Sequence, residues 1–451
     1  SCFSYYPLIS FNGLRSPAFF LAFYFVSSRV RSMGSARFLT MALVASCLVN
    51  VAVSAGQLAR GRGIRIDSFQ AGSPLAGLDL QVGDIIVGAD DNRVESLQDL
   101  SNAIDSSRGK FVIKYERSER DLDIVLSRKA LQQASGAGPE RLGITVARGR
   151  NLRVTGFYSH YETYAEVLQL IASLAIGMLI ALERKRSKMG LFLAGSAFLI
   201  SAALILTLTR SALAGLALSI VVMTVASFRP KVALLAALVL LLAAPLAVVM
   251  VRQSRGISFV DTSEGSTAYR LEIWREAFGL IKNNPVVGIG KGSDGEMRQK
   301  LGLFQNGKLP PGHFHSSPIQ VAVWWGLPAL ALYAAFMLIF VVETWRLARA
   351  CQDRGHWSAW GMSLGILGAL IAFNLSSLVQ FNFGDGEVSM ALWLLAGLAF
   401  AIRRLELGSA PCPQLITKSE GPQPNTSDRN QVPPPAEAFE ETGRATALAS
   451  S

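Results

Sequence analysis

Cysteine and histidine are scarce in this chain of 451 residues, which contains four of each. The cysteines lack the spacing of a metal site or a disulfide framework, so we expect them to be unpaired: Cys2, Cys47, Cys351 and Cys412. An H-E-x-x-H motif is absent, which removes the ligands of an intramembrane zinc protease. The glycine-rich stretch 288–295 lacks the Lys-Ser/Thr of a phosphate-binding P-loop. We therefore expect no metal and no other cofactor.

Charged residues are also few, at 17%, whereas hydrophobic residues make up 51% and the mean hydropathy is +0.35. A soluble protein of this size would be more polar, so we expect several membrane spans and at least one water-soluble part. The net charge of +11 could indicate nucleic-acid binding. The basic residues, however, occur in short clusters between apolar runs, as in the cytoplasmic loops of membrane proteins. We expect a lipid bilayer as a partner and no nucleic acid.

Apolar runs of sufficient length predict eight membrane spans, while a ninth run, 17–26, is short for a span. The eight are 38–55, 164–182, 191–208, 212–228, 232–251, 317–342, 359–380 and 390–402. In this scheme the basic clusters near residues 29–37, 183–188, 229–231, 346–354 and 403–404 all face the cytoplasm. Four polar residues fall together on the opposite, outer side: Arg210, Arg270, His315 and Asp385.

The composition divides the chain into five parts. Residues 1–56 form an N-terminal membrane segment that we expect to be incomplete, because the chain starts Ser-Cys rather than Met. Residues 57–129 form a small domain, and 130–162 a linker whose first part is rich in Gln, Ser, Gly and Ala. Residues 163–402 form the main membrane domain with an outer loop at 252–314. Residues 403–451, rich in Pro, Ser, Glu and Gly, are expected to be a disordered cytoplasmic tail.

The small domain combines short runs of β-forming residues with a helix near 97–104. Its segments AGSPLAGLDLQVGDIIVGADDNRV and LQDLSNAI resemble a bacterial PDZ domain. The resemblance implies that the domain lies outside the membrane and binds an extended peptide C-terminus by strand addition. The peptide carboxylate would rest on the backbone N–H groups of Arg62, Gly63 and Ile64. The alternative is a packing module that binds no peptide.

The outer loop contains an amphipathic helix, expected at 268–282 and followed by a stop at Asn-Asn-Pro. Arg270 falls in its first turn, where backbone N–H groups and the helix dipole favour an anion. Arg275 lies further along and fits a solvated helix face better. His315 stands directly before an apolar run, and a neutral imidazole can take a proton from a hydroxyl group. An arginine and a histidine on one loop favour group transfer with a charged leaving group.

Arg210 is a further candidate for binding an anion, and His313, His160 and Asp385 are secondary candidates. Arg210 ends one apolar run and begins another, a costly place for an arginine unless its side chain reaches the membrane surface or binds an anion. His313 is either an orienting neighbour of His315 or an exposed residue. His160 precedes a span on the outer side, and Asp385 lies in a short outer loop.

Several segments of the membrane domain resemble the O-antigen ligase and polymerase superfamily of bacterial inner-membrane glycosyltransferases. They are LTLTRSALAG around Arg210, YRLEIWREAFGLIKNNPVVGIGKG from Tyr269, HFHSSPIQVAVWWGLPAL from His313, and RVTGFYSHYETYAEVL from Arg153. A family pattern of His, then Asn, Ser or Gln, then nine residues and Gly falls on His315, Ser316 and Gly326. Three features depart from the family: Ala329 where a small turn residue such as Gly is common, the PDZ-like insertion, and fewer spans than usual.

The resemblance implies a metal-independent transfer of a glycan from undecaprenyl diphosphate to an acceptor hydroxyl at the periplasmic face. His315 would be the base, and Arg210 and Arg270 would hold the diphosphate. Ligation of O-antigen to lipid A-core, in lipopolysaccharide biosynthesis, is the first expectation for the acceptor. O-antigen polymerisation and transfer to a protein hydroxyl remain alternatives. A non-catalytic membrane scaffold that presents a PDZ domain is an alternative of another class.

Overall fold

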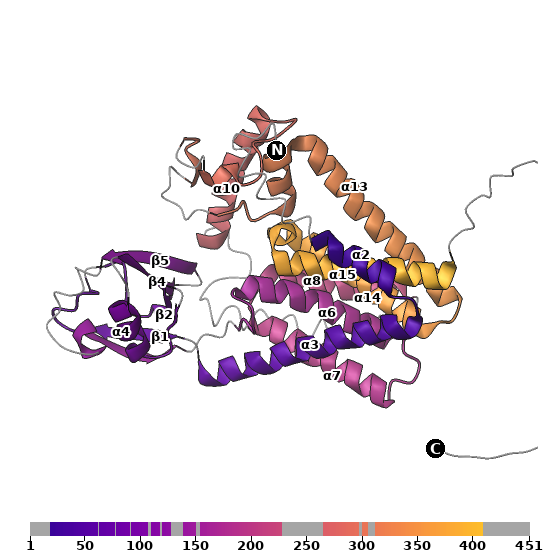
Figure 1. The fold of residues 1–451 in the computed structure, drawn as a ribbon, viewed down its shortest axis with the longest axis horizontal. Coiled ribbons are helices and arrows are strands. Elements are labelled where there is room, and N and C mark those ends of the chain that lie inside the picture. The colour runs from indigo at the N-terminus through magenta and orange to yellow at the C-terminus, as the bar shows by residue number, and fades with distance from the viewer. Residues whose placement is uncertain are drawn as a thin grey trace, which may run out of the picture. The chain divides into compact units, whose positions relative to one another are not determined.

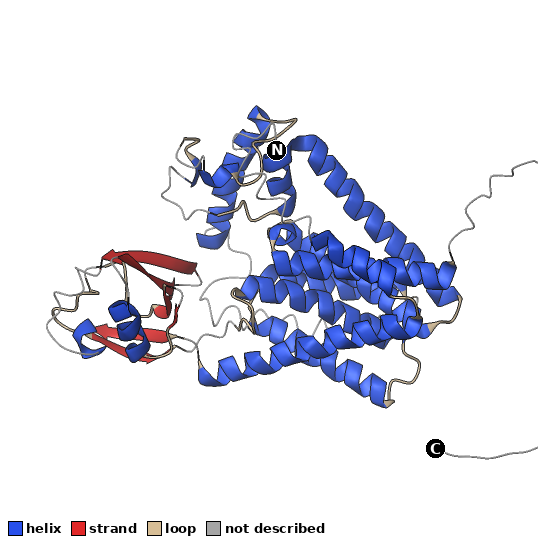
Figure 2. Cartoon of the chain, in the orientation of Figure 1, coloured by secondary structure: helices blue, strands red, loops and turns tan. Residues whose placement is uncertain are grey.

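The computed structural model describes residues 19–227 and 265–408, apart from gaps at 62, 77, 91, 107–109, 118–119, 128–138, 150–153, 297–299 and 305–311. Arg62, the expected span 232–251 and the tail after 408 therefore lie outside the described residues. The described part consists of a helix bundle, a helical segment before His315 and one small sheet that holds all the described strands (Figures 1 and 2).

Helices make up most of the described chain, and six of them are long and apolar enough to cross a membrane. These six are α3 (Met33–Arg60), α6 (Tyr161–Ala181), α7 (Lys188–Leu206), α13 (Ser317–Asp353), α14 (Trp357–Ser377) and α15 (Gly386–Leu407). The other described helices outside the small sheet domain are α2 (Phe20–Arg29), α8 (Arg210–Ala226), α10 (Gly265–Asn283) and the short α11 (Ser293–Glu296). Seven of the expected spans correspond to described helices, which fits a polytopic helical membrane protein.

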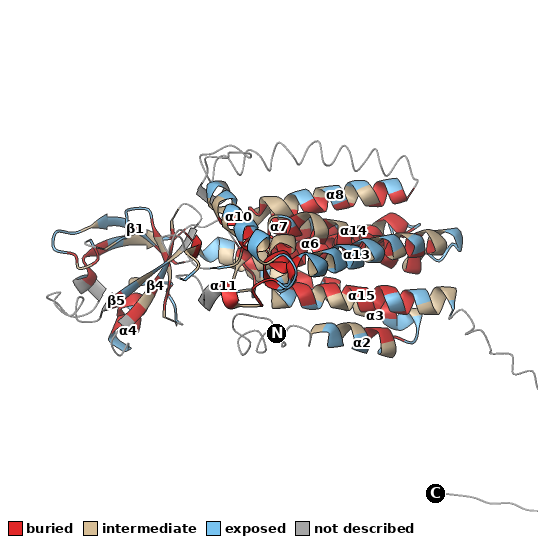
Figure 3. Ribbon diagram, turned by 90° about the horizontal axis from the view of Figure 1, so that it is seen from above, coloured by how far each residue is buried: buried red, intermediate tan, exposed pale blue. Residues whose placement is uncertain are grey.

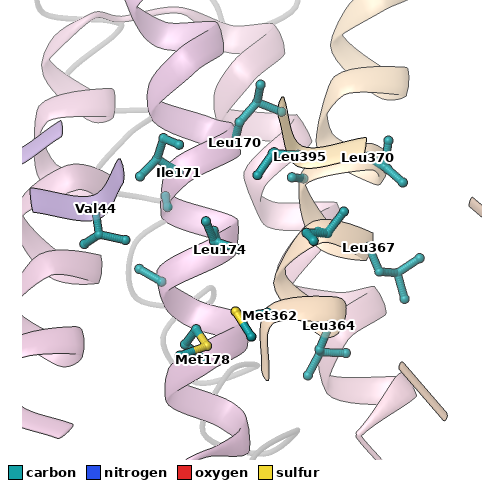
Figure 4. Close-up of a cluster of buried hydrophobic side chains, with 14 of the residues drawn as sticks. Val44, Leu170, Ile171, Leu174, Met178, Met362, Leu364, Leu367, Leu370 and Leu395 are labelled. Carbon is teal, nitrogen blue, oxygen red and sulfur yellow. The ribbon is translucent and has the colours of Figure 1, made fainter. Parts of the chain in front are cut away.

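The centre of the bundle is the close pair α6 and α14, which is buried along most of its length (Figure 3). Small residues permit this approach, since a Cβ on Gly365 would lie 2.7 Å from the Cα of Leu174. Apolar side chains from α3, α6, α14 and α15 fill the space around the pair (Figure 4). Apolar side chains on the outer face of α13, such as Leu332 and Leu338, are exposed and suit contact with lipid.

Contacts along the helices fix their directions. Gln169 of α6 donates a hydrogen bond to Ser376 at the end of α14, so these two helices are antiparallel. Ser173 of α6 bonds to Ser219 of α8 at 2.9 Å, and Gln169 lies beside Gly215, so α6 and α8 are parallel. The beginnings of α6, α8 and α15 and the ends of α3 and α14 therefore meet at one end of the bundle, which we call the Tyr161 end.

The opposite end of the bundle, which we call the basic end, holds most of the described arginines and lysines that flank the spans. Residues 183–188 follow α6 there, and Arg403 and Arg404 lie in the last turns of α15. Arg404 donates hydrogen bonds to the carbonyl oxygens of Ser27 and Val30, both at 2.6 Å, and so fastens α2 to α15. The expected gathering of basic clusters on one side of the membrane matches this arrangement.

Helix α13 is broken at Gly326, where φ is 82° and ψ is 177°. A short helix, 317–325, precedes the break, and the long apolar helix 327–353 follows it. The expected span 317–342 starts with this helix but runs through the break and stops short of the helix end at Asp353, because the apolar pattern continues through the break without a visible change. Residues with a Cβ cannot adopt this positive φ without strain, whereas glycine can.

The small sheet contains β1 (Ile64–Phe69), β2 (Ile85–Ala89), β3 (Asn92–Arg93), β4 (Lys110–Arg117), β5 (Arg120–Ser127) and β6 (Ile144–Arg148). The strands pair antiparallel in the order β5-β4-β2-β1-β6, and β3 pairs with β2. Helix α4 (Leu97–Ser106) buries Leu100 and Ile104 in the sheet's core. The 3-10 helix η2 (Pro139–Leu142) leads into β6.

Strand β6 lies inside the segment expected to be a linker, 130–162, so the expected domain boundary at 129 was wrong. Five residues of β6 pair with β1, from Ile144 opposite Phe69 to Arg148 opposite Ile64. The segment before β6 is rich in Gln, Ser, Gly and Ala, and this composition concealed a strand of only five residues.

Candidate active site

The loop that contains His315 is held from two directions at the Tyr161 end of the bundle. The backbone N–H of Phe314 donates to Oε1 of Gln320 at 2.8 Å. The indole N–H of Trp274, in α10, donates to the Phe314 carbonyl oxygen at 2.8 Å. Ser316 caps the following helix by accepting from the N–H of Ile319. The position of His315 is therefore fixed by α10 and α13 together.

Asp294 in α11 stabilises the same loop through two residues of α13. Its carboxylate accepts a hydrogen bond from Trp324 Nε1 at 2.7 Å and from Gln320 Nε2 at 3.2 Å. Gln320 is thereby oriented with its oxygen toward Phe314. Sequence reasoning missed Asp294, because nothing in the glycine-rich stretch indicated that its carboxylate would be buried.

His315 has a backbone φ of 46°, which is rare for a residue other than glycine. Strain of this kind costs about 1–3 kcal/mol and occurs preferentially at functional sites. Its backbone N–H donates to Nδ1 of His313 at 3.1 Å, and the two rings lie 4.3 Å apart. Tyr269 of α10 approaches the His315 ring edge-on at 5.8 Å. His313 also packs against Phe381, so it is a neighbour of His315 rather than an exposed residue.

Both imidazoles are neutral at neutral pH. Burial, together with the nearby His313 and Arg270, lowers the pKa of His315 to about 4, and Glu162 acts in the opposite direction. Burial also lowers the pKa of His313. A neutral imidazole has a lone pair that can accept a proton from a hydroxyl group.

Arg270 lies on the same side of α10 as Tyr269 and faces α6. Its Nη2 lies 3.7 Å from Oε1 of Glu162, and the two side chains are 19% and 22% exposed. Arg275, by contrast, is 78% exposed and pairs with Glu272 at 3.0 Å on the outer face of α10. The structure thus brings Arg270 and His315 to one site and leaves Arg275 out of it.

Glu162 is a site residue that sequence reasoning missed. It lies in the first turn of α6, where His160 caps the helix and its Nδ1 accepts from the N–H of Glu162 at 3.2 Å. The Gln380 side chain interacts with both Glu162 and His315. The available signal was a carboxylate two residues after a histidine at the mouth of a span. The span expected from the sequence begins at residue 164, just beyond Glu162.

Arg210 is the first residue of α8 and lies at the Tyr161 end. The pairings of α6 with α8, Gln169 beside Gly215 and Ser173 with Ser219, place Arg210 level with Tyr164. This position rests on the helix register alone. Leu208, two residues earlier, has a φ of 55°, so the tight corner before Arg210 is also strained.

Asp385 is the N-cap of α15, where it accepts from the N–H groups of Glu387 and Val388. It also accepts a hydrogen bond from the Thr163 hydroxyl of α6. The carboxylate of Asp385 therefore links α15 to α6 at the Tyr161 end and has a structural role.

Two buried polar atoms of the site have no hydrogen-bond partner among the described residues: Nδ1 of His315 and Nε of Arg270. Nε of the guanidinium is a donor, and Nδ1 is the acceptor in the imidazole tautomer that carries its proton on Nε2. Buried polar groups are normally paired, so unpaired ones call for an explanation, and a missing ligand is one. Three His, Cys, Asp or Glu side chains placed to hold a metal ion do not occur in the described part of the chain.

The peptide site expected beside β1 is not available as we placed it. Gly63 takes a positive φ of 70° and leads into Ile64, but β1 is paired on both sides, with β2 and with β6. The edge where a peptide strand would add is occupied by the chain's own β6. Among the described strands, β6 itself has a neighbour on one side only.

Comparison with known families gives one match: residues 194–334 fit the model of the O-antigen ligase family. The matched range contains Arg210, Arg270, His315 and Gly326, and it does not contain Glu162. The match supports a place in the O-antigen ligase superfamily and a glycosyltransferase role of the ligase or polymerase type. A search of curated proteins finds no match for the chain.

Proposed function

We propose that this O-antigen ligase-like protein transfers a glycan from undecaprenyl diphosphate to an acceptor hydroxyl. The observation that carries the proposal is the pair of unpaired buried atoms, Nδ1 of His315 and Nε of Arg270, at one site. An acceptor hydroxyl would donate to the imidazole nitrogen, and a phosphate oxygen would accept from the guanidinium. Both buried groups would then be satisfied by the substrates.

The transfer follows from these two contacts. His315 Nδ1 takes the proton of the acceptor hydroxyl, whose oxygen forms a bond to the anomeric carbon of the glycan. The bond from that carbon to the phosphate oxygen breaks, and undecaprenyl diphosphate leaves with the electron pair. Arg270, with Arg210 from the corner before α8, stabilises the negative charge of the leaving diphosphate. Attack opposite to the leaving group inverts the configuration of the anomeric carbon.

The distribution of charge supports a periplasmic site in a bacterial inner membrane. Basic residues between spans lie preferentially in the cytoplasm, so the basic end of the bundle is assigned there. The Tyr161 end, with His315 and Arg270, then faces the periplasm. Nucleoside triphosphates are absent from that compartment, which suits a lipid-linked donor that is already activated. Lipid A-core is the acceptor we favour, ahead of a growing glycan or a protein hydroxyl.

The decisive experiment incubates purified protein with a lipid-linked glycan and each of three acceptors: lipid A-core, a second lipid-linked repeat unit, or a serine-containing protein. We expect His315→Ala to abolish transfer and Arg270→Lys to reduce it strongly, since an ammonium group cannot replace a two-pronged contact. Arg275→Lys is the matched control and should keep full activity. Transfer by His315→Ala at the wild-type rate would contradict the proposal and favour a scaffold.

A second proposal concerns the small PDZ-like sheet. We propose that it binds a peptide C-terminus along β6, because β6 has a neighbour on one side only among the described strands. The turn before β6 contains Gly143, whose φ of 57° suits a carboxylate-binding turn. Titration of the full-length protein with peptides that differ only in a free or amidated C-terminus tests this. Equal affinities for the two forms would refute it.

A further inference from the structure

Glu162 lies at Nη2 of Arg270, next to the Nε that is proposed to donate to a phosphate oxygen of the donor, so a two-pronged phosphate contact would compete with it. Its carboxylate oxygen lies 3.7 Å from the guanidinium, and both side chains are about one-fifth exposed. A carboxylate and a phosphate oxygen make the same kind of contact with an arginine. In the absence of substrate, Glu162 therefore neutralises the cation that the donor needs.

Glu162 is also linked to His315. The carboxylate of Glu162 acts to raise the pKa of His315, and the side chain of Gln380 interacts with both residues. The other groups that face His315 are mostly cationic or neutral. They come from its own loop and from α10: His313, Arg270 and Tyr269.

The interactions of Glu162 with Arg270 and with His315 change in strength during a transfer reaction. Before the donor binds, Arg270 is a full charge and His315 is neutral, so the carboxylate is attracted mainly to Arg270. A diphosphate on Arg270 brings negative charge beside Glu162 and repels it. When His315 takes the acceptor's proton, a second cation forms on the other side of the same carboxylate.

We propose that Glu162 is a positioning residue that holds Arg270 in the empty site, yields it to the donor diphosphate, and then stabilises the imidazolium of His315. This inference rests on the proposed function. Glu162 touches no reacting atom and forms no bond. It acts through Arg270 and His315. Glu162 lies outside the family match at 194–334.

Glu162→Gln separates the two roles, because the amide keeps the size of the side chain and removes its charge. Loss of competition at Arg270 should lower the KM for the lipid-linked donor about threefold, the strength of a partly exposed ion pair. Loss of the counter-charge should lower kcat about tenfold or more. The acid limb of the kcat/KM profile should also move to lower pH, since Glu162 raises the pKa of His315.

A merely structural ion pair would give a different result. Its removal would lower thermal stability and leave the pH profile in place, or raise KM and lower kcat together. Either outcome, or wild-type kinetics, would overturn the inference. Glu272→Gln is the matched control: it removes the same charge from the exposed pair with Arg275 and should change none of the three quantities.

A binding arm keeps this test separate from the proposed transfer reaction. Undecaprenyl diphosphate is titrated into the full-length protein without any acceptor. Glu162→Gln should bind it about threefold more tightly than wild type. If the wild-type protein transfers glycans and this variant gains no affinity, Glu162 does not compete with the donor, and the inference fails while the proposed function stands. If the wild type transfers no glycan, the proposed function fails first.

Discussion

Substitution of Gly326 by alanine tests how the break in α13 positions the site. The residue has a φ of 82°, and a Cβ added there would lie 2.2 Å from the carbonyl oxygen of Val286. Val286 belongs to the turn that follows α10, the helix that carries Arg270. The same turn bonds to α13 just after the break, where the N–H of Leu327 donates to the Pro285 carbonyl oxygen at 2.7 Å.

The expected cost has two parts. An alanine in this glycine-specific backbone conformation is strained by about 1–3 kcal/mol. The 2.2 Å approach is to backbone rather than to a flexible side chain, so the turn must move, and the hydrogen bond from Leu327 is weakened at a cost of about 1 kcal/mol. The local destabilisation of Gly326→Ala is therefore about 2–4 kcal/mol. A displacement of Arg270 by an ångström could reduce transfer about 100-fold.

Thermal unfolding in detergent and the glycan-transfer rate measure the two effects. Gly195→Ala is the matched control, because a Cβ at that exposed helical position in α7 meets nothing within 4 Å. We expect Gly195→Ala to keep the wild-type melting temperature and rate. A Gly326→Ala protein with both wild-type values would show that the break does not position the site.

Three further predictions concern separate parts of the molecule. His315 must be neutral to act as a base, and its pKa is lowered to about 4. Wild-type kcat/KM should therefore stay level from pH 7.5 down to about pH 5 and fall below that pH. A fall that begins near pH 6.5 would contradict the argument that His315 is a buried base. Trp274→Phe leaves the Phe314 carbonyl without its indole donor, and at about 1–3 kcal/mol for such a loss the transfer rate should fall at normal expression; an unchanged rate would show that α10 does not hold the loop. The Asp84 carboxylate is 2% exposed and accepts two hydrogen bonds of 2.8 Å from Arg117. Asp84→Asn removes its charge, so amide hydrogen exchange in β2 and β4 should accelerate while the transfer rate is unchanged. Exchange protection equal to that of the wild type would refute the stabilising role of this pair.

The membrane topology could be predicted from the sequence because apolar runs and basic clusters are both strong signals. The spans at α3, α6, α7, α14 and α15 were located from hydropathy, and their alternating directions followed. The break in α13 could not be predicted in this way, since tryptophan, leucine and glycine are all compatible with a continuous apolar run. The positive φ of Gly326 and the close backbone approach of a distant turn identify the break.

The candidate site was predicted in part. Arg270 and His315 were named from their positions at the start of a helix and of an apolar run, and they lie at one site. Arg275, on the same helix, pairs with Glu272 instead, because residues five positions apart on a helix face different directions. Glu162 could not be predicted because it precedes the expected span 164–182, whereas the helix itself begins at Tyr161.

Strand β6 shows a different limit. Its five residues pair with β1 across a long gap in sequence, and strand pairing of this kind depends on tertiary contacts rather than on local preference. The resemblance to PDZ domains placed the peptide site beside Gly63 and Ile64, where a neighbouring strand was not foreseen. The edge occupied by β6 could only be recognised once the strand order was known.

Polar groups inside the bundle explain why the site has a defined geometry although its parts are far apart in sequence. Glu166, one turn beyond Glu162 on α6, accepts hydrogen bonds from Ser376 at 2.8 Å and from Asn382 at 3.2 Å. Asn382 in turn accepts from the hydroxyl of Ser317 at 2.9 Å, two residues after His315. A carboxyl group in the interior of a membrane bundle is costly unless its hydrogen bonds are made. The network therefore fixes the start of α13 against α6, and a patterning argument based on apolar residues alone cannot reveal it.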